Sequence, residues 1–494
     1  MRSNLEYRPE IDTLRAISVF AVIIYHAGFY DKLFFPGGYL GVDIFFVISG
    51  YLISKLILKE IFKTKKFNIK KFYERRARRI LPALIFVTIT TLIFSFLILL
   101  PSSLVDFANS VISSLGFLSN YYFYFSGQEY ASESSLLKPL LHTWSLSVEE
   151  QFYVIFPILI IIIYKYKKIE FLHFIIITSI LSIIFAEYLS QKNEMLNFYT
   201  LPTRAWEILL GALISYLELK RSKNKPSFIN EIFVFMGLII IISSFIIYDE
   251  TVKHPTFRSL YPVVGTLLIL YFAKPQLKIV KFLSLKVFTF FGLISYSLYL
   301  WHYPIFALSK HIFFGNNLFE YSIIILLLIS ASIFSYYFIE KPFRGTKISL
   351  RIFIYIIGLS YSILLLSSVL IIENTGYKSR FPNLGKFSLD NQQYIKERRL
   401  FEKKIGTPSF KNLMKTNVVV VGNSHAQDLF HSLYLNKDLF NQYEFSKISL
   451  DNLLCFKKFL FENMICDIPV SKKINRIFNL SDIILIAPNY KDDL

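Results

Sequence analysis

The chain has 494 residues, of which 54% are hydrophobic and 17% are aromatic, and its mean hydropathy is +0.48. These values exclude a soluble enzyme and indicate a polytopic membrane protein. The formal net charge of +19 does not indicate a nucleic-acid-binding protein, because the Lys and Arg residues stand in short clusters between apolar stretches. We therefore expect the chain to lie in the lipid bilayer and to bind no nucleic acid.

Apolar stretches of about 20 residues, each long enough to cross about 30 Å of hydrocarbon, recur as far as residue 372. The segment 103–125 is ambiguous, because Asp106, Asn109 and Asn120 lie within it. If it does not cross, the basic loops all fall on one side, which the positive-inside rule makes cytoplasmic. We therefore predict an interfacial or re-entrant segment there, with the N-terminus inside and the C-terminus outside. The eleven predicted spans are 11–30, 38–62, 79–100, 146–164, 169–189, 199–219, 229–248, 259–273, 286–308, 319–340 and 350–372.

A smaller domain of different composition follows the membrane part. The sequence TNVVVVGNSHAQDLF indicates a buried strand at 418–421, a tight turn and a helix, and DIILIAP at 482–488 indicates a second strand. Cys455 and Cys466, the only cysteines, either form a disulfide outside the membrane or remain free thiols. The predicted parts are an all-α membrane domain at 1–345, an additional transmembrane helix at 346–373, a linker or extension at 374–416 and a partial α/β domain at 417–494.

The first predicted span carries Arg15 near one end and His26 near the other. Ionisable groups at membrane depth are costly, so they normally face a protein interior or a wet cavity and mark a functional site. The separation of eleven residues corresponds to about 16 Å along a helix, so the two side chains cannot contact the same group. Imidazole titrates near neutrality, which makes His26 the best candidate base of the membrane domain. The competing interpretations are a structural histidine bonded to a backbone carbonyl and an arginine that snorkels to the cytoplasmic interface.

Four arginines, Arg75, Arg76, Arg78 and Arg79, stand at the start of the third predicted span. Guanidinium groups bind phosphate oxygens in a bidentate manner, so the cluster would suit an anionic ligand. The competing interpretation is a topology signal, since residues 63–79 hold nine Lys or Arg against one Glu.

Other polar side chains are expected toward the outer side, level with His26. Asp43 lies in the outer part of the second predicted span, where it would either orient His26 or pair with Arg204. Ser147 and Glu150 have the spacing of a capping box for the helix over 146–164, which leaves Glu149 unexplained. Trp301 is interpreted as an interfacial residue. The further residues expected on the outer side are His142, Trp144, Glu149, Glu207 and His302.

Several blocks, in this order, match one family: YRPEIDTLRAISVFAVIIYH, FPGGYLGVDIFFVISGYLI, FYERRARRILPAL, HTWSLSVEEQFYVIFP, ISYSLYLWHYPIF and FIEKPFR. They run from residue 7 to about 345, and the chain resembles the acyltransferase 3 family of membrane O-acyltransferases. The stretch VVVVGNSHA resembles the first block of SGNH-type domains, which are fused behind the membrane domain in many bacterial O-antigen and cell-envelope acetylases.

This resemblance implies transfer of an acyl group, usually acetyl from cytoplasmic acetyl-CoA, to a hydroxyl of lipopolysaccharide or another surface glycan. The expected location is the bacterial inner membrane, with the C-terminal domain outside. The family's functional histidine falls on His26, and the family favours Arg76 and Arg79 as the functional arginine pair. No metal is expected. The candidate residues are His26, Asp43, Glu149 and Ser424 for catalysis, Arg15, Arg76 and Arg79 for CoA, and Trp144, Arg204, Glu207 and His302 for the glycan.

The chain departs from the SGNH pattern in two places. Asn423 stands where the family commonly has Asp, and the distal Asp-x-x-His has no counterpart before Leu494, so we expect a truncated domain. The stretch DLFH at 428–431 has that spacing but lies on the helix just after Ser424, and we interpret it as a coincidence. The rival functions are a transporter or flippase, since intramembrane charges also mark translocation paths, and a catalytically inactive scaffold.

Overall fold

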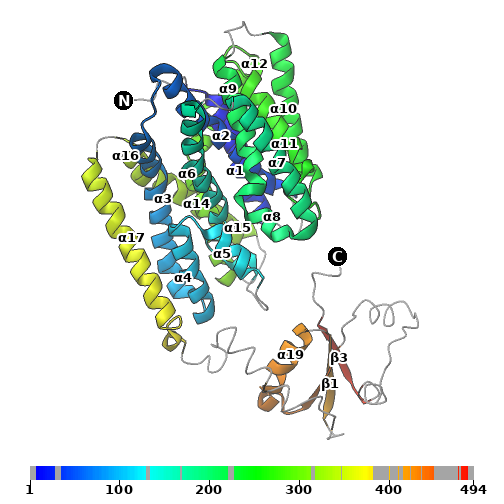
Figure 1. Cartoon of the computed structure of the whole chain (residues 1–494). Coiled ribbons are helices and arrows are strands. Elements are labelled where there is room, and N and C mark those ends of the chain that lie inside the picture. Colours follow the sequence, from blue (N-terminus) through cyan, green and yellow to red (C-terminus); the bar gives the residue numbers. More distant parts are fainter. Residues whose placement is uncertain are drawn as a thin grey trace. The chain divides into compact units, whose positions relative to one another are not determined.

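The structure is a computed structural model (Figure 1). The chain forms two compact units, Met1–Ser388 and Leu389–Leu494. The described part of the first is helical and that of the second contains a sheet, so the prediction of an all-α membrane domain followed by a smaller α/β domain is confirmed. The described residues are 7–27, 35–128, 134–166, 170–220, 227–312, 318–345, 348–381, 400, 410, 415–422, 424–435, 437–449, 477 and 480–487.

The first unit is a bundle of long apolar helices with short helices between them (Figure 1). The longer helices are α1 (Pro9–Ala27), α2 (Gly41–Thr64), α3 (Ile69–Ile98), α6 (Thr143–Tyr166), α7 (Phe171–Lys192), α9 (Leu201–Lys220), α10 (Phe228–Ile247), α14 (Ser295–Ile312), α15 (Leu318–Phe334) and α17 (Leu350–Glu373). The shorter ones are α4 (Pro101–Leu115), α5 (Ser119–Ser126), α8 (Glu194–Tyr199), α11 (Leu260–Phe272), α12 (Lys278–Leu283), α13 (Lys286–Leu293) and α16 (Lys341–Arg344).

Seven helices in the described part of the chain are long and apolar enough to cross a membrane. They correspond to seven of the predicted spans. The other four predicted spans are also helical, as α1, α9, α11 and the α13–α14 pair, but they do not meet the same length and composition criteria. The multi-pass architecture is therefore confirmed, and the total of eleven spans stays a prediction.

One predicted span is interrupted. The stretch 286–308 forms two helices, α13 and α14, which are separated at Ile294. Gly292 stands two residues before the break, and a Cβ atom there would overlap the carbonyl group of Asp12 on α1. The predicted span 286–308 therefore forms two consecutive helices, and the close approach of α13 to α1 lies beside the break between them.

The segment predicted not to cross begins with α4, which reaches only to the middle of α17. The Tyr361 hydroxyl, midway along α17, donates to the carbonyl of Leu115 at the end of α4 (2.6 Å). Arg380, just beyond α17, donates to the carbonyl of Leu99, just before α4 (3.1 Å). The chain then bends at 116–118.

The second short helix of this segment, α5, leads back toward the end at which the segment entered. The hydroxyl of Ser126, its last residue, accepts a hydrogen bond from Lys138, in the stretch that precedes α6 (3.2 Å). Both ends of 101–126 thus lie toward the same end of the bundle, which is the re-entrant arrangement expected from the loop charges.

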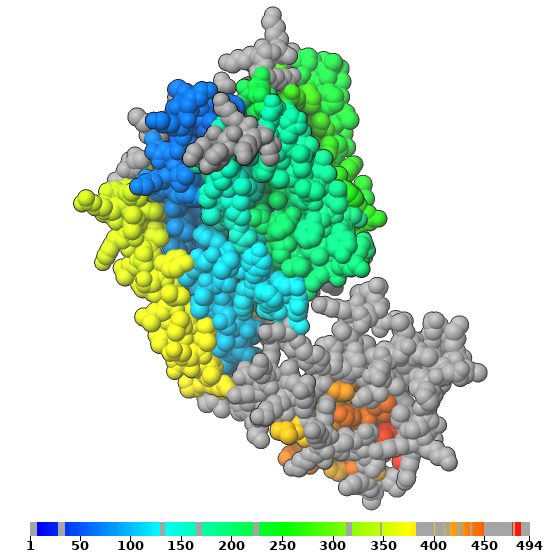
Figure 2. Space-filling model, in the orientation of Figure 1, coloured from blue at the N-terminus to red at the C-terminus, as the bar shows by residue number. Residues whose placement is uncertain are grey.

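The bundle has a closely packed helix pair in its interior and an exposed helix on its surface. α2 and α9 approach closely through Gly50 and Gly211, because a Cβ atom on either would overlap a backbone carbonyl of the other helix. α17 lies along one side of the bundle, as its yellow surface shows (Figure 2). Only 17% of its most apolar stretch is buried, as expected for a helix that faces lipid.

The second unit contains β1 (Thr416–Gly422), α19 (Ser424–Leu435), β2 (Tyr443–Ser449) and β3 (Ile483–Ala487). The strands form a parallel sheet in the order β2–β1–β3, and the valines at 418–421 are buried at its centre. The two predicted strands and the intervening helix are confirmed, and β2 is an addition. Cys455 and Cys466 lie outside the described residues, so their pairing stays a prediction.

Candidate functional site

Three histidines from distant parts of the sequence gather in the membrane unit. His26 lies in the last turn of α1, His142 directly precedes α6 and His302 lies on α14. The ring of His302 is 5.3 Å from that of His26 and 5.5 Å from that of His142, and the Tyr303 ring is 5.0 Å from His26. We refer to His26, His142 and His302 as the histidine cluster.

Several ring nitrogens of the histidine cluster have no hydrogen-bond partner among the described residues. His302 Nδ1 lies 2.6 Å from the carbonyl oxygen of Tyr299. A carbonyl only accepts, so Nδ1 carries the proton and Nε2 presents a lone pair. That Nε2 and both ring nitrogens of His142 are buried and have no hydrogen-bond partner among the described residues. Buried polar atoms are nearly always satisfied, so this arrangement suits a ligand hydroxyl.

A second group of charged side chains lines one pocket. Arg15 on α1, Arg76 and Arg79 on α3 and Glu149 on α6 face a cavity with about 750 Å³ of empty space, its open mouth included. The guanidinium of Arg76 also lies 4.3 Å from the centre of the Tyr153 ring, a cation–π contact that holds it in place. We refer to this cavity as the arginine pocket.

The arginines of the basic cluster fall into two kinds. Arg78 forms an ion pair with Glu74 at 2.9 Å, and Arg75 forms one with a carboxylate of α2 at 3.8 Å. Arg76 and Arg79 have no carboxylate within ion-pair distance in the part of the chain that the structure describes. Two half-buried guanidinium groups that face a cavity and make no direct ion pair among the described residues suit a bound anion.

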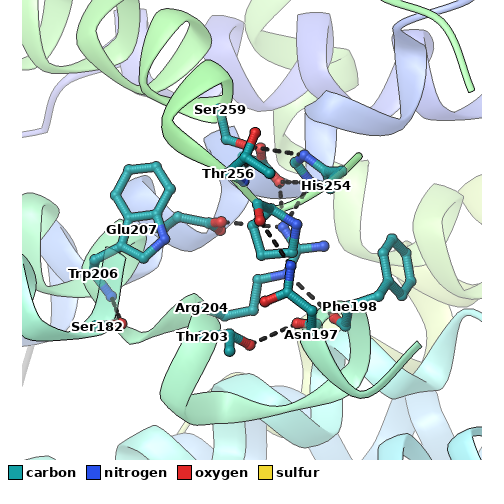
Figure 3. A network of polar contacts seen from close by, with 12 residues as sticks. Ser182, Asn197, Phe198, Thr203, Arg204, Trp206, Glu207, His254, Thr256 and Ser259 are labelled. Atoms are coloured by element: carbon teal, nitrogen blue, oxygen red, sulfur yellow. Dashed lines mark hydrogen bonds and ion pairs between the residues drawn. The ribbon is translucent and has the colours of Figure 1, made fainter. Parts of the chain in front are cut away.

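A third group is a buried ionic network around Arg204 (Figure 3). Its Nη1 atom lies 3.0 Å from Asp43 Oδ1, 3.1 Å from Glu207 Oε1 and 2.7 Å from His254 Nε2. His254 Nδ1 in turn lies 2.8 Å from the hydroxyl of Ser259. Arg204, Asp43 and Glu207 are each at most 1% exposed. The network ties α2, α9 and the stretch before α11 together.

The aromatic side chains beside this network include one predicted glycan residue. The Arg204 guanidinium lies 5.4 Å from the Trp144 ring and 5.0 Å from the Phe198 ring. Trp144 is 6% exposed and packs against Phe198 at 4.6 Å. Trp144 and Arg204 are therefore together, as expected, but they lie within the network.

The residues expected on the outer side thus separate into different groups. Of the two partners considered for Asp43, the structure pairs it with Arg204, and no hydrogen bond joins it to His26. Glu149 lies in the arginine pocket, where it accepts hydrogen bonds from Ser49 (3.0 Å) and Tyr153 (3.2 Å). α6 begins at Thr143, which puts Glu149 about 9 Å further along the helix. The expectation that Glu149 lies beside His26 is wrong.

The capping-box interpretation is also wrong. Because α6 begins at Thr143, Ser147 lies one turn inside the helix, and its hydroxyl pairs with that of Ser119 on α5 (2.7 Å). Glu150 does not reach back to the helix start, and its Oε1 is buried without a partner among the described residues.

Trp301 is a core residue and not an interfacial one. It is 7% exposed and its ring packs edge-on against that of Phe86 at 6.0 Å. The apolar side chains of α3 and α14 surround it because these helices pack against each other.

Sequence reasoning missed His254 and Tyr299. His254 lies in the polar stretch between α10 and α11, where neither spacing nor charge pattern indicated burial. Tyr299 lines the arginine pocket and its ring is 5.2 Å from that of His302, so it contacts both the pocket and the histidine cluster. The spacing of Tyr299 and His302 on one helix was the available signal.

Ser424 is the first residue of α19 and follows β1, as predicted, although Asn423 between them lies outside the described residues. The side chains of Ser424 and His425 also lie outside the described part. A helix N-terminus supplies backbone N–H donors, and the role of Ser424 as a nucleophile stays a prediction.

The fold and these groups define a multi-pass membrane protein with polar groups inside its bundle: a pocket lined by guanidinium groups that have no ion pair among the described residues, and buried histidines that share the neighbour Tyr299 with this pocket. Residues 8–340 match the family model of the acyltransferase domain, Acyl_transf_3, and the chain belongs to this acyltransferase family.

The chain is also similar to individual members of the family. It is 33% identical over 351 residues to the O-acetyltransferase OatA of Staphylococcus aureus (strain NCTC 8325 / PS 47), which covers 68% of this chain and 57% of OatA. It is 33% identical over 355 residues to a protein of Staphylococcus aureus (strain MSSA476) whose name proposes O-acetyltransferase activity, with 69% and 58% covered. The chain therefore matches somewhat more than half the length of these relatives. No solved structure matches it.

Proposed function

We propose that the protein transfers an acyl group, in the first place acetyl, from cytoplasmic acyl-CoA to a hydroxyl of a bacterial surface polysaccharide such as the lipopolysaccharide O-antigen. The observation that carries this proposal is the arginine pocket, in which Arg76 and Arg79 have no carboxylate within ion-pair distance among the described residues, and whose lining residue Tyr299 also contacts the histidine cluster. The names of the similar proteins support O-acetyl transfer.

The donor is expected to enter from the cytoplasm. CoA carries several phosphates, which Arg76, Arg79 and Arg15 would bind as bidentate partners. Arg76 and Arg79 lie at the end of the basic stretch 63–79, which the positive-inside rule places on the cytoplasmic side. Arg15 and His26 lie about 16 Å apart along α1, and an extended pantetheine arm spans such a distance.

The acceptor hydroxyl is expected at the histidine cluster. His26 accepts the proton of the hydroxyl while its oxygen attacks the carbonyl carbon of the thioester. The carbon–sulfur bond then breaks, and the proton passes to the departing thiolate of CoA. His302, whose Nε2 is available as an acceptor, orients the hydroxyl. Asp43 and Glu207 act through Arg204, with which Asp43 Oδ1 and Glu207 Oε1 form ion pairs.

The test compares the surface glycan of cells with and without the protein by mass spectrometry. We expect an acetyl ester that is present only when the chain is present and that is lost in a double variant in which Arg76→Ala and Arg79→Ala are combined. Glycan export that depends on the chain without any change in acetylation would favour a transporter and contradict the proposal.

A further inference from the structure

The arginine pocket and the histidine cluster share one wall. Tyr299 and Ser145 both line the pocket. The Tyr299 ring also lies 5.2 Å from that of His302 and 5.6 Å from that of His142. Tyr299 therefore borders both the pocket and the cluster, and Ser145 lies beside it.

Hydrogen bonds hold the wall in one position. The Tyr299 hydroxyl and Ser145 Oγ lie 2.5 Å apart, and both lie within hydrogen-bond distance of the carbonyl of His142, at 3.1 and 3.2 Å. Phe45 on α2 packs edge-on against the ring at 6.0 Å. The hydroxyl of Tyr299 is thus held by a hydrogen bond to Ser145 on α6, and its ring packs against Phe45 on α2.

The wall lies at the end of the pocket away from the arginines. On α6, Tyr153 contacts the Arg76 guanidinium, and Ser145 lies eight residues before Tyr153 in the sequence. Eight residues correspond to about 12 Å along a helix. A ligand whose anionic end lies at Arg76 therefore directs its other end toward Tyr299.

We propose that Tyr299, braced by Ser145, is the specificity-determining residue that limits the length of the acyl group. This inference rests on the proposed function, because it takes acyl-CoA as the occupant of the pocket. The thioester end of the donor meets a hydrogen-bonded ring that has little freedom to move. Acetyl ends before the ring, whereas each further methylene extends the acyl chain against it. A pocket of fixed size discriminates against one extra methylene by about tenfold or more.

The experiment measures competition between acetyl-CoA and butyryl-CoA for transfer to the glycan by the full chain in membranes. Tyr299→Ala should shift the ratio of products toward butyryl by about tenfold or more. Tyr299→Leu keeps apolar packing, and we expect an intermediate shift from it should the alanine variant fail to accumulate. Tyr299→Phe retains the ring but loses the hydrogen bonds of its hydroxyl to Ser145 and to the His142 carbonyl, and should give a smaller shift than Tyr299→Leu.

The matched control is Tyr361→Phe, which removes a tyrosine hydroxyl that donates to the Leu115 carbonyl away from the pocket. It should leave the ratio unchanged. Normal acetyl transfer with a wild-type ratio in both Tyr299→Ala and Tyr299→Leu would overturn the inference alone. A wild-type chain that transfers neither acyl group, with the glycan and both donors supplied, would overturn the proposed function and the inference with it.

Discussion

Arg76 and Arg79 differ from Arg75 and Arg78 in what their guanidinium groups contact, although the four stand within one stretch of five residues. Arg75 and Arg78 have carboxylate partners, as a structural or topological arginine does. Arg76 and Arg79 face the arginine pocket without one in the described part of the chain. A cluster that only sets the membrane topology would not need two arginines in a pocket without carboxylate partners, since lysine sets topology equally well.

The arginine pair can be tested by charge-conserving substitution. Replacing Arg76 and Arg79 by Ala should weaken acyl-CoA binding, and replacing them by Lys should restore it poorly, because an ammonium lacks the bidentate fork. Binding of acetyl-CoA to the purified protein measures both. Arg75→Lys is the matched control and should bind normally. Full restoration by lysine at both positions would favour the topology interpretation.

Substitutions in the buried network around Arg204 test whether Asp43 has a structural or a catalytic role. Removing one partner of a buried ion pair leaves an uncompensated charge, which costs about 3–5 kcal/mol. Asp43→Ala and Arg204→Ala should therefore lower the unfolding temperature in detergent and the amount of protein in the membrane. A variant that accumulates and unfolds like the wild type but is inactive would show that Asp43 acts on the reaction directly.

At the scale of the helices, much of the fold could be predicted, because the positions and lengths of the apolar stretches can be read directly from the sequence. The apolar stretches predicted the long helices, and the four valines at 418–421 predicted the central strand. The break at Ile294 could not be predicted, because it accompanies the approach of Gly292 to α1, which is a tertiary contact.

The candidate site was predicted in its residues but not in its grouping. Arg15, Arg76 and Arg79 do share one pocket. Glu149 was misplaced because the start of α6 was predicted three residues too late and the helix was read as one with a capping box. The ion pair of Asp43 with Arg204 depends on the packing of α2 against α9, so it could not be predicted from the sequence of either helix alone.

The re-entrant pair α4–α5 makes a prediction about accessibility. In a chain without Cys455 and Cys466, cysteines introduced at Leu100 and at Gln128 flank the pair. Both should react with a membrane-impermeant thiol reagent from the same side, because the pair enters and leaves at one end of the bundle. Labelling of the two positions from opposite sides would show that the segment crosses and would change the orientation of every later helix.

At the scale of the whole molecule, the two units raise the question of which one completes the transfer. A serine nucleophile needs a base within hydrogen-bond reach. His425 follows Ser424 on α19, and adjacent residues of a helix do not face each other. We predict direct transfer by the membrane unit, so Ser424→Ala in the 494-residue chain should keep its acetylation activity. Activity that is lost with the serine would show that the acyl group passes through the second unit.

The most direct test of the central claim is transfer of labelled acetyl from acetyl-CoA to surface glycan in membranes that contain the chain or its His26→Ala variant. Loss of a general base typically reduces the rate by about 10²- to 10⁴-fold. We predict label in the glycan with the wild-type chain and a loss of this size with His26→Ala at equal protein level. Labelling at the wild-type rate by the variant would contradict the role of His26, and no labelling by the wild-type chain would contradict acyl transfer itself.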